Sequence, residues 1–416
     1  MPDLMNTPEK TNDKKRRSVV ITGVGFISAM GNTPEDVRKS IVQNRIFFER
    51  PAIDSSLAVA PVTDFNVKTY TGRCKDARYL NRGAAFAVAA ALMAVKQSGL
   101  EAESLENAGL FAASGPNMDI SDEFKNIVDS RISEQGLSAL FLLKFLPNTA
   151  TSLIAQLTGV HGENMTLGSA CSASLMAIGE AYRKIKDGYL DTALAGGGDS
   201  RLSPGGLLSY RKAGALWQGS EDPAAHYTPF GPNRKGFIPG EGGAFFVLES
   251  LYHAEKRNAR IIGEIIGYGA TLDGHAMTAP RPDGFYAERA VRKAMDEASI
   301  RHEEMDLISA HGTGTDLNDS MEAAMISRVF KNSQPGITSF KSWIGHLASA
   351  CGAVELALCL ACSTIGLFPC IRNLKQSIGP CLDILTTSRS MSPSHILLEN
   401  FGFGGQNSAL VVKPWI

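Results

Sequence analysis

Three residues that are far apart in the sequence carry side chains suited to acyl or proton transfer. The first, Cys171, lies in "LGSACSASLMAIGEAYRKIKDG", residues 167–188, where small residues precede a segment with helical spacing. At a helix N-terminus, free backbone N–H groups and the positive dipole end stabilise a thiolate, so we expect the pKa of Cys171 to be lowered. Most buried cysteines are inert, however, and on this position alone a structural thiol is the stronger interpretation.

Two histidines strengthen the interpretation of Cys171 as a catalytic residue. His311 opens "HGTGTDLNDSMEA" directly after the apolar run "LISA", and His346 lies in "KSWIGHLASACGA". A single histidine is more often structural than catalytic. Both of these, however, lie in segments of small residues, where the backbone can approach a ligand closely. With Cys171 they form a candidate set for nucleophilic catalysis.

Two other uses of such a set remain open. A zinc site could use one cysteine and two histidines, although none of the three lies at the short intervals that zinc ligands usually show. A hydrolase with a Cys-His-Asn triad would need only one base and an orienting amide. We therefore predict no metal and keep the hydrolase as an alternative.

The elements that must position these residues occur twice along the chain. A β-branched run closed by glycines, residues 18–28, is echoed at residues 260–274. Each copy is followed by a helical segment (84–100 or 288–300), a short apolar strand, and a second helix that opens with small residues (171–188 or 345–361). The pattern indicates a duplicated α/β unit with helices covering sheets.

The second helix of the first copy has a clear apolar stripe. Leu175, Ile178, Tyr182 and Ile185 are spaced three and four apart, and Gly188 suits the position just after the helix. We expect residues 1–17, which are polar and lysine-rich, to be a disordered leader without a signal peptide. The two halves are expected to span residues 18–255 and 256–416.

Composition excludes several functional classes. The formal net charge is −1 and 44% of the residues are hydrophobic, so there is no general nucleic-acid footprint. The seven cysteines are odd in number, which favours reduced thiols in the cytosol. The longest apolar run, residues 353–371, contains Glu355 and ends in a Phe-Pro break. It is therefore predicted to be a buried helix and not a membrane span.

Five ordered motifs together resemble the elongating β-ketoacyl-acyl carrier protein synthases of the thiolase superfamily, the KAS I/KAS II type that includes type II polyketide ketosynthases. The motifs are "SACSAS" (169–174), "GEGGAFFVLE" (240–249), "HGTGTDLNDSMEA" (311–323), "KSWIGHLASACGA" (341–353) and "NFGFGGQN" (400–407). The resemblance runs from about Ser18 to the C-terminus. It implies an α/β fold of five layers, αβαβα, built from two similar halves.

The resemblance also implies a reaction and the residues that perform it. Cys171 would take an acyl chain from the phosphopantetheine arm of an acyl carrier protein, with no bound cofactor. The acyl-enzyme would then condense with malonyl-carrier protein as CO₂ leaves, while His311 and His346 hold the malonyl thioester. Lys341 and Glu322 match a charged pair of the family, or form only a structural ion pair.

Further positions follow from the same resemblance. The backbone N–H groups of Cys171 and Phe403 would form an oxyanion hole in a gate that includes Gly402 and Gly404. Thr313 and Thr315 would contact the pantetheine arm, while Pro116 and Phe401 would gate the acyl pocket. Candidates for docking the acidic carrier protein are Arg73, Lys75, Arg78, Arg82, Arg211 and Lys212.

The chain also departs from the family pattern. Gly231 and Lys235 stand where two aspartates are usual, and Gln406 replaces a threonine, so we expect an altered ion-pair network there. Pro116 cannot swing as a rotamer gate. This favours a specialised chain, such as the unsaturated chain of a polyene, over housekeeping fatty acid elongation.

Two alternative functions remain open. A chain-length factor is a non-catalytic relative that pairs with a ketosynthase, and it usually lacks the nucleophile that Cys171 would supply here. A hydrolase or transacylase on the same scaffold would also use Cys171. Some dimer, either with a second copy or with a chain-length factor, is expected.

Overall fold

The computed structural model describes residues 17–118, 139–379 and 382–415. The predicted leader lies outside the described residues, apart from its last residue. Arg17 pairs there with Asp191 through its guanidinium, at 2.5 Å.

The strands of the first half of the chain and those of the second half repeat one arrangement. The first half contributes β1 (Val19–Ile27), β2 (Gly109–Ala113), β3 (Asn164–Leu167), β4 (Thr192–Ser200) and β5 (Glu241–Ser250). The second half contributes β6 (Gly263–Leu272), β7 (Leu307–Ser309), β8 (Gly336–Thr338), β11 (Ile396–Gly402) and β12 (Gln406–Pro414). A separate two-stranded ladder joins β9 (Leu367–Phe368) to β10 (Arg389–Ser390).

The order of the strands establishes the predicted duplication. The main sheet runs β3-β2-β4-β5-β1-β6-β12-β11-β7-β8. If the strands of each half are numbered along the chain, both halves have the order third, second, fourth, fifth, first from the outer edge of the sheet to its centre. Parallel and antiparallel pairings also match between the halves. The two first strands, β1 and β6, pair with each other, with Val19 opposite Ile265.

Helices cover both faces of each set of strands. The longer helices are α1 (Pro34–Val42), α3 (Arg82–Ser98), α6 (Thr149–Thr158), α7 (Ala173–Lys186), α8 (Pro204–Lys212), α11 (Phe285–Ala298), α12 (Asp316–Val329) and α14 (Cys351–Ile365). The shorter ones are α2 (Lys68–Thr71), α4 (Ala102–Glu106), α9 (Pro223–His226), α10 (Leu251–Lys256) and α13 (Lys341–Ile344).

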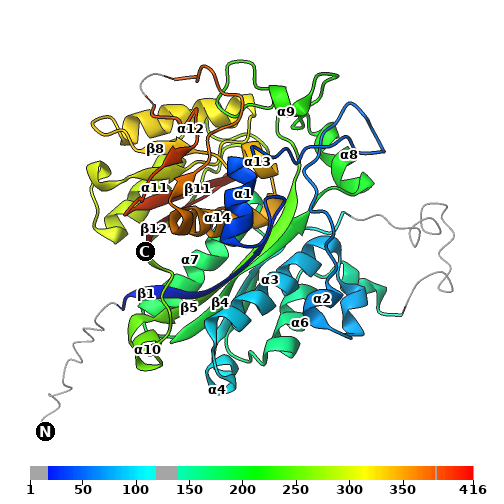
Figure 1. The fold of residues 1–416 in the computed structure, drawn as a ribbon, viewed down its shortest axis with the longest axis vertical. Helices are drawn as coiled ribbons and strands as arrows, with labels where there is room; N and C mark the ends of the chain where they lie inside the picture. The colour runs from blue at the N-terminus through cyan, green and yellow to red at the C-terminus, as the bar shows by residue number, and fades with distance from the viewer. Residues whose placement is uncertain (1–16, 119–138, 380–381, 416) are drawn as a thin grey trace, which may run out of the picture.

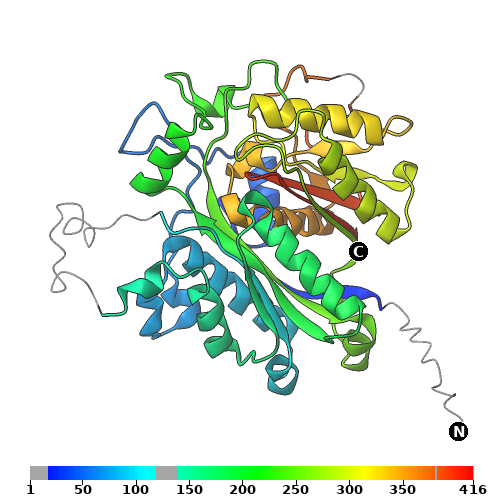
Figure 2. The same ribbon diagram turned by 180° about the vertical axis from the view of Figure 1, so that it is seen from behind.

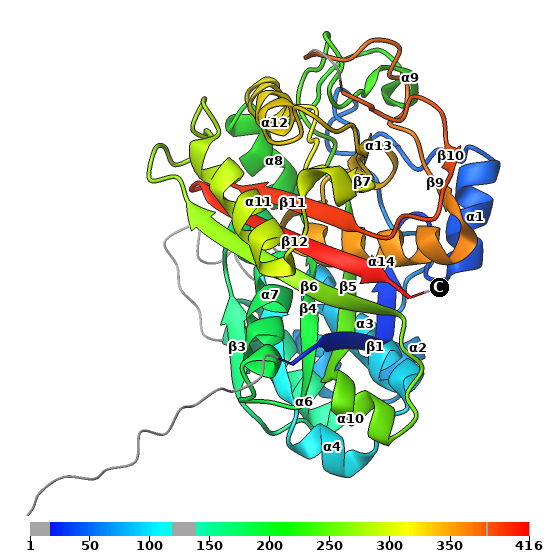
Figure 3. The same ribbon diagram turned by 90° about the vertical axis from the view of Figure 1, so that its left-hand side faces the viewer.

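The layers follow the predicted αβαβα order. Figure 3 shows α7 and α14 between the strands of the two halves, with α11 and α12 on the outside of the second half. On the outer side of the first half, α3 packs against β1, β4 and β5 (Figure 1). The view from behind shows α7 crossing the strands of the first half (Figure 2). The predicted division at residues 255 and 256 falls in the last turn of α10, between β5 and β6.

Hydrophobic patterning explains the central layer. The stripe predicted on α7 is buried and joins the largest apolar core, together with residues of α14 such as Val354 and Leu358. Gly188 has the left-handed φ expected just after the helix. Only residues 348–365 among those described are long and apolar enough to cross a membrane, and 89% of that stretch is buried inside the protein. This confirms the prediction of a buried helix up to Ile365, but not beyond it, because Gly366 ends the helix with a left-handed backbone and Leu367–Phe368 form β9.

Candidate active site

Cys171 lies in a tight turn between β3 and α7. The turn is a 3₁₀ segment, Ala170–Ser172, and the backbone of Ala170 is left-handed with φ of 47°. Cys171 therefore precedes the helix and is not in its first turn. A matching 3₁₀ turn, Ala348–Ala350, precedes α14 in the second half, and Ala348 also has φ of 47°.

The expected lowering of the Cys171 pKa is wrong. Burial raises the pKa of Cys171 to about 11, although the positive charge of Lys341 and a backbone hydrogen bond from Phe403 act in the opposite direction. The side chain is only 9% exposed, so the thiolate loses its hydration. The resting nucleophile is a thiol.

His346 is held as a neutral imidazole with a defined proton. Its Nδ1 atom accepts the N–H of Ala348 at 2.9 Å, which leaves the proton on Nε2. The Sγ atom of Cys351 lies 3.6 Å from the same nitrogen. Burial, helped by the charge of Lys341, lowers the pKa of His346 to about 3. The free N–H of the ring is therefore a permanent donor at neutral pH.

His311 is also neutral. It follows β7, and its ring lies 5.6 Å from that of His346 between centroids, at 83°. Burial, Lys341 and His346 hold the pKa of His311 well below 6.5. The amide nitrogen of Asn400 lies 3.4 Å from its Nδ1 atom, which favours the proton on Nε2 here too.

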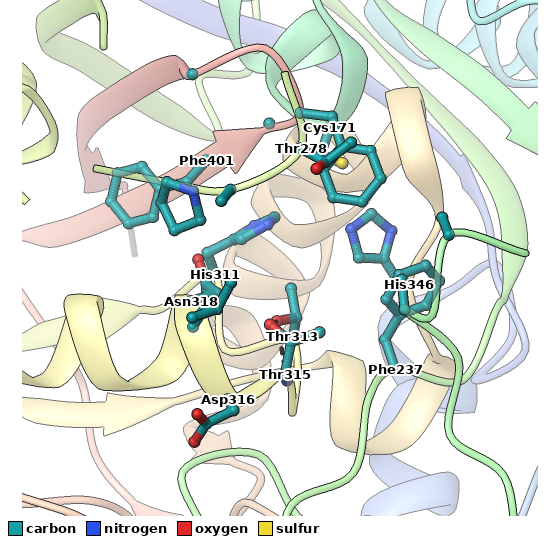
Figure 4. Close-up of a pocket in the computed structure, with 18 of the residues that line it drawn as sticks. Cys171, Phe237, Thr278, His311, Thr313, Thr315, Asp316, Asn318, His346 and Phe401 are labelled. Atoms are coloured by element: carbon teal, nitrogen blue, oxygen red, sulfur yellow. Dashed lines mark hydrogen bonds between the residues drawn. The ribbon is translucent and has the colours of Figure 1, made fainter. Parts of the chain in front are cut away.

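The structure brings the three predicted side chains together. The sulfur of Cys171 and ring nitrogens of His311 and His346 lie within 4.8 Å of one another, and Figure 4 shows the two rings facing the thiol. Cys171 comes from the first half and both histidines from the second. Atoms of these kinds can also bind zinc, so the expectation of no metal stays a prediction.

Lys341 pairs with Glu355 and not with Glu322. The two buried side chains of the pair meet at 2.5 Å, from Nζ to Oε1. Glu322 instead accepts the backbone N–H groups of His311, at 2.6 Å, and Gly312, at 2.8 Å. It fixes the loop that carries His311, whereas Glu355 holds the lysine beside both histidines.

The loop after His311 is shaped by a buried carboxylate, Asp319. Asp319 accepts the N–H groups of Thr313, at 3.0 Å, and Gly314, at 3.1 Å. The hydroxyls of Thr313 and Thr315 lie 2.9 Å apart and line a cavity that also reaches both histidines. This placement fits the predicted contact with an extended arm.

Two cavities meet at Cys171. The histidine cavity, of about 290 Å³, is lined by residues that include Cys171, His311, His346, Thr313 and Phe401. The proline cavity, of about 360 Å³, is lined by residues that include Cys171, Pro116, Asp199, Arg201 and Ser349. Phe403 and Tyr210 line both cavities.

The two predicted gate residues therefore lie in different cavities. Phe401 is in the histidine cavity, with its ring 5.9 Å from that of His311, while Pro116 is in the proline cavity. Phe403, predicted for the oxyanion hole and the glycine-rich gate, lines both cavities.

The glycine-rich segment approaches Cys171 closely. A Cβ atom on Gly402 would lie 3.0 Å from the backbone nitrogen of Cys171. Gly404 has φ of 85°, a left-handed value that favours glycine. The chain can thus bring the N–H groups of Phe403 and Cys171 to one side of the sulfur.

The predicted docking residues divide into two groups. Arg82 forms a salt bridge with the buried Glu241 at 2.6 Å, so its guanidinium already has a partner within the protein, although the side chain is 42% exposed. Arg211 pairs with Asp54, while Lys212 is exposed directly before Ala213, which lines the histidine cavity. The other three are exposed on the segment before α3: Arg73, Lys75 and Arg78. Figures 1 and 2 show α2 and α8 apart, so the groups form no single patch within the described chain.

The departures from the family pattern have local partners. Lys235 pairs with Glu221 at 3.2 Å, and the neighbouring Arg234 pairs with Asp316 at 2.5 Å. The carbonyl of Gly231 accepts from Arg234 at 3.0 Å. The carbonyl of Gln406 accepts the hydroxyl of Ser172 at 2.7 Å. Ion pairs are thus present at this loop, and the expected difference from the family's network stays a prediction.

Sequence reasoning missed several residues of the site. Glu355 had a usable signal, since a charged residue inside an apolar helix needs a partner. Asp319, in the motif "HGTGTDLNDSMEA", could also have been predicted, because acidic side chains often accept hydrogen bonds from the backbone N–H groups of a short loop. Nothing in the sequence marked Tyr210 or the pair of Asp199 with Arg201.

Comparison with known proteins agrees with this geometry. Family models described as β-ketoacyl synthase, N-terminal domain, and β-ketoacyl synthase, C-terminal domain, match residues 16–254 and 262–375. The 3-oxoacyl-[acyl-carrier-protein] synthase 2 of Synechocystis sp. is 31% identical, over 97% of this chain and 99% of that protein.

Solved structures agree as well. A β-ketoacyl synthase from Burkholderia phymatum has a TM-score of 0.87 at 28% identity, covering 96% of this chain and 100% of that one. The ishigamide ketosynthase/chain length factor has a TM-score of 0.85 at 28% identity, with the same coverage. The chain therefore belongs to the β-ketoacyl synthase family, and it is an acyltransferase that carries out the condensation of 3-oxoacyl-acyl carrier protein synthases.

Proposed function

We propose that Cys171 takes an acyl chain from a carrier protein and passes it to the carbanion formed from malonyl-carrier protein. The observation that carries this proposal is the grouping of Cys171, His311 and His346 within 4.8 Å, where two cavities meet. The histidine cavity would receive the pantetheine arm and the proline cavity the acyl chain. Each substrate then reaches the sulfur from its own side.

In the first half-reaction, Cys171 attacks the acyl thioester. A new carbon–sulfur bond forms, the bond to the carrier sulfur breaks, and the thiol proton ends on the departing carrier thiol. The oxyanion of the intermediate accepts hydrogen bonds from the N–H groups of Cys171 and Phe403. Because the pKa of Cys171 is about 11, proton loss accompanies attack and does not precede it.

In the second half-reaction, the malonyl thioester loses CO₂. The electron pair of the broken carbon–carbon bond forms an enolate, whose oxygen accepts hydrogen bonds from the Nε2–H groups of His311 and His346. Both imidazoles are neutral, so they donate hydrogen bonds without adding a cation that would have to be dehydrated. The enolate carbon then attacks the acyl group and releases Cys171.

The partners and pathway belong to this proposal. An acidic carrier protein would approach the mouth of the histidine cavity near Arg211 and Lys212. Because one similar structure is described as a ketosynthase/chain length factor, we propose a dimer with a second copy or with such a partner, in the cytosol. Pro116 in the proline cavity supports a specialised chain over housekeeping elongation.

One experiment separates the candidate functions. The protein is incubated with acyl-carrier protein and malonyl-carrier protein, and mass spectrometry follows acyl-Cys171 and the 3-oxoacyl product. Cys171→Ala should abolish acylation, whereas His346→Ala should allow acylation and reduce product formation. Acylation without any elongation would contradict the condensing role and support a transacylase. Failure of the wild type to acylate would support a non-catalytic partner subunit.

The same assay tests the pathway. A panel of acyl chains on several carrier proteins should show a preference that differs from that of a housekeeping enzyme. A plain preference for saturated chains of medium to long length would contradict the specialised role.

A further inference from the structure

A buried carboxyl group without a hydrogen-bond donor lies beside the segment that carries His311. This group belongs to Glu399, near the end of β11, which is fully buried. No group among the described residues donates a hydrogen bond to either of its side-chain oxygens. We propose that Glu399 keeps its proton, donates a hydrogen bond through it to the carboxylate of Glu322, and so acts as a positioning residue for His311. The inference deepens the proposed function, on which it rests for the role of His311.

The register of two parallel strands places Glu399 at this position. Leu398 on β11 pairs with Ser309, the last residue of β7, so Glu399 lies level with the first residue beyond that strand. From α12, the side chain of Glu322 reaches the same place and meets the carboxyl group of Glu399 within hydrogen-bond distance. Two carboxylates would repel each other at this separation, whereas one proton between them makes the contact favourable.

The proton belongs to Glu399, because Glu322 has the donors that a carboxylate needs. Glu322 accepts three hydrogen bonds, at 2.6, 2.8 and 3.0 Å, from the backbone of His311, the backbone of Gly312 and the side chain of Asn318. Such bonds favour the ionised form of a carboxyl group. An ionised Glu399 would lose its hydration with no such compensation from the described residues. Burial and the charge of Glu322 raise the pKa of Glu399 well above 4.5.

The charges around the pair also act against a second carboxylate. Lys341 is a positive charge that acts on Glu322, but its Nζ atom is already bonded to Glu355. Asp319 on α12 adds a further negative charge beside the pair, and Arg234 acts on that carboxyl group. An ionised Glu399 would therefore enter a region where both cations already act on other carboxyl groups.

The shared proton affects chemistry through His311. Glu322 holds the backbone N–H of His311, and thereby fixes the ring whose Nε2–H would bond the enolate oxygen. If Glu399 were ionised, repulsion would push Glu322 away from this loop. A displacement of about 1 Å, even by a change distant from the reacting atoms, can slow a reaction by about 10²-fold. Condensation should therefore depend on the donor that Glu399 supplies.

The first test compares the wild type with Glu399→Gln by urea unfolding at several pH values from about 5.5 to 7.5. Glutamine keeps a donor for Glu322 but has no proton to lose. Above about pH 4.5 Glu399 is ionised in the unfolded wild type and protonated in the folded one, so stability falls as the pH rises toward the folded pKa. The unfolding constant of the wild type, divided by that of Glu399→Gln, should rise about tenfold per pH unit. The histidines contribute equally to both proteins, and their effect cancels in this ratio.

Glu255→Gln is the matched control. Glu255 is exposed on α10, so its charge is the same in both states, and the corresponding ratio should not vary with pH. A ratio for Glu399→Gln that is independent of pH would overturn the inference, because Glu399 would then be ionised in the folded protein. The measurement needs no turnover and does not depend on the proposed function.

The second test measures the effect on chemistry. Condensation of preformed acyl-Cys171 with malonyl-carrier protein is followed at pH 7 in the wild type, Glu399→Gln and Glu399→Ala. Glu399→Ala removes the donor and should lower kcat about tenfold at an unchanged KM, as expected for one hydrogen bond to a charged group. Glu399→Gln should restore kcat to within about twofold of the wild type.

The outcomes of this second test separate the two proposals. Equal kcat values in all three proteins would overturn the positioning role of Glu399 and leave the proposed function intact. Acylation of Cys171 without condensation in the wild type would contradict the proposed function, and the unfolding ratio would still decide whether Glu399 keeps its proton.

Discussion

Lys341 and Glu355 form a buried ion pair at the centre of the site, with Nζ 2.5 Å from Oε1. The side chains of Lys341 and Glu355 are 0% and 2% exposed. The second carboxylate oxygen of Glu355 accepts from Asn400 at 2.8 Å, so the pair also connects α13 and α14 to the strand that ends in the glycine gate. The lysine charge lowers the pKa values of both histidines and of Cys171.

Removal of one member of this pair should destabilise the protein strongly. Lys341→Met leaves the Glu355 carboxylate buried without its cation, which costs about 3–5 kcal/mol. The double variant Lys341→Met/Glu355→Gln should regain most of that stability, because a glutamine oxygen can still accept from Asn400. Urea unfolding measures both variants. A single variant as stable as the wild type would contradict this account.

The same double variant tests whether Lys341 affects chemistry as well as folding. Without the lysine charge, the pKa of Cys171 should rise further, and acylation should remain slower than in the wild type even though stability returns. Pre-steady-state acylation followed by mass spectrometry gives the rate. Full recovery of the rate would mean that the pair is only structural.

The reactivity of Cys171 should increase with pH well into the alkaline range. Because only the thiolate is nucleophilic and the pKa is about 11, alkylation by iodoacetamide should speed up about tenfold per pH unit from pH 7 to about pH 10. Peptide mass spectrometry separates Cys171 from the partly exposed Cys74 and Cys370. A plateau below pH 8 would mean that a stabilised thiolate is present after all.

The sequence predicted the parts of the site that depend on local motifs. Cys171, His311 and His346 each follow a strand or precede a helix in a recognisable segment, and the strand order places those segments at one edge. The duplicated fold was predictable for the same reason, because each half repeats a run of strand, helix, strand and helix.

The parts that depend on tertiary burial were not predictable. Local helix geometry suggested a lowered pKa for Cys171, but the folded chain buries the thiol, and the lost hydration raises its pKa instead. The partner of Lys341 was misjudged because Glu322 and Glu355 are both close to the histidine loops in sequence. Only the packing of α14 decides between them. Tyr210 gave no signal because the junction of the two cavities, which it lines, is formed by segments of both halves.

The two buried histidines should make stability depend on pH. In the folded protein the pKa of His346 is about 3, whereas an unfolded histidine titrates near 6.5. The unfolded state therefore binds more protons below pH 6.5, and stability falls as the pH decreases from there toward 3. His346→Gln should remove up to about 1.4 kcal/mol per pH unit of this slope between pH 5 and 6.

Urea unfolding at several pH values gives the slope. His275, an exposed histidine, provides the control, and His275→Gln should keep the wild-type slope. An unchanged slope in His346→Gln would mean that the imidazole is protonated inside the folded protein, which would contradict its role as a neutral donor.

Gly402 offers a test of the oxyanion hole that leaves every catalytic side chain in place. Its added Cβ in Gly402→Ala would lie 3.0 Å from the backbone nitrogen of Cys171 and 3.2 Å from the carbonyl oxygen of Ser169, which is tighter than nine in ten real Cβ contacts. The turn that presents the N–H of Cys171 must then shift. Loss of one oxyanion donor typically slows such reactions about 10²–10³-fold, so both acylation and condensation should slow by a large factor. The thermal midpoint should fall by only a few degrees, because the shift is confined to one turn.

If His346→Ala slows condensation alone while Gly402→Ala slows both steps, the N–H groups and the histidines act on different oxygen atoms. A Gly402→Ala enzyme that acylates at the wild-type rate would show that the N–H of Cys171 does not stabilise the first intermediate.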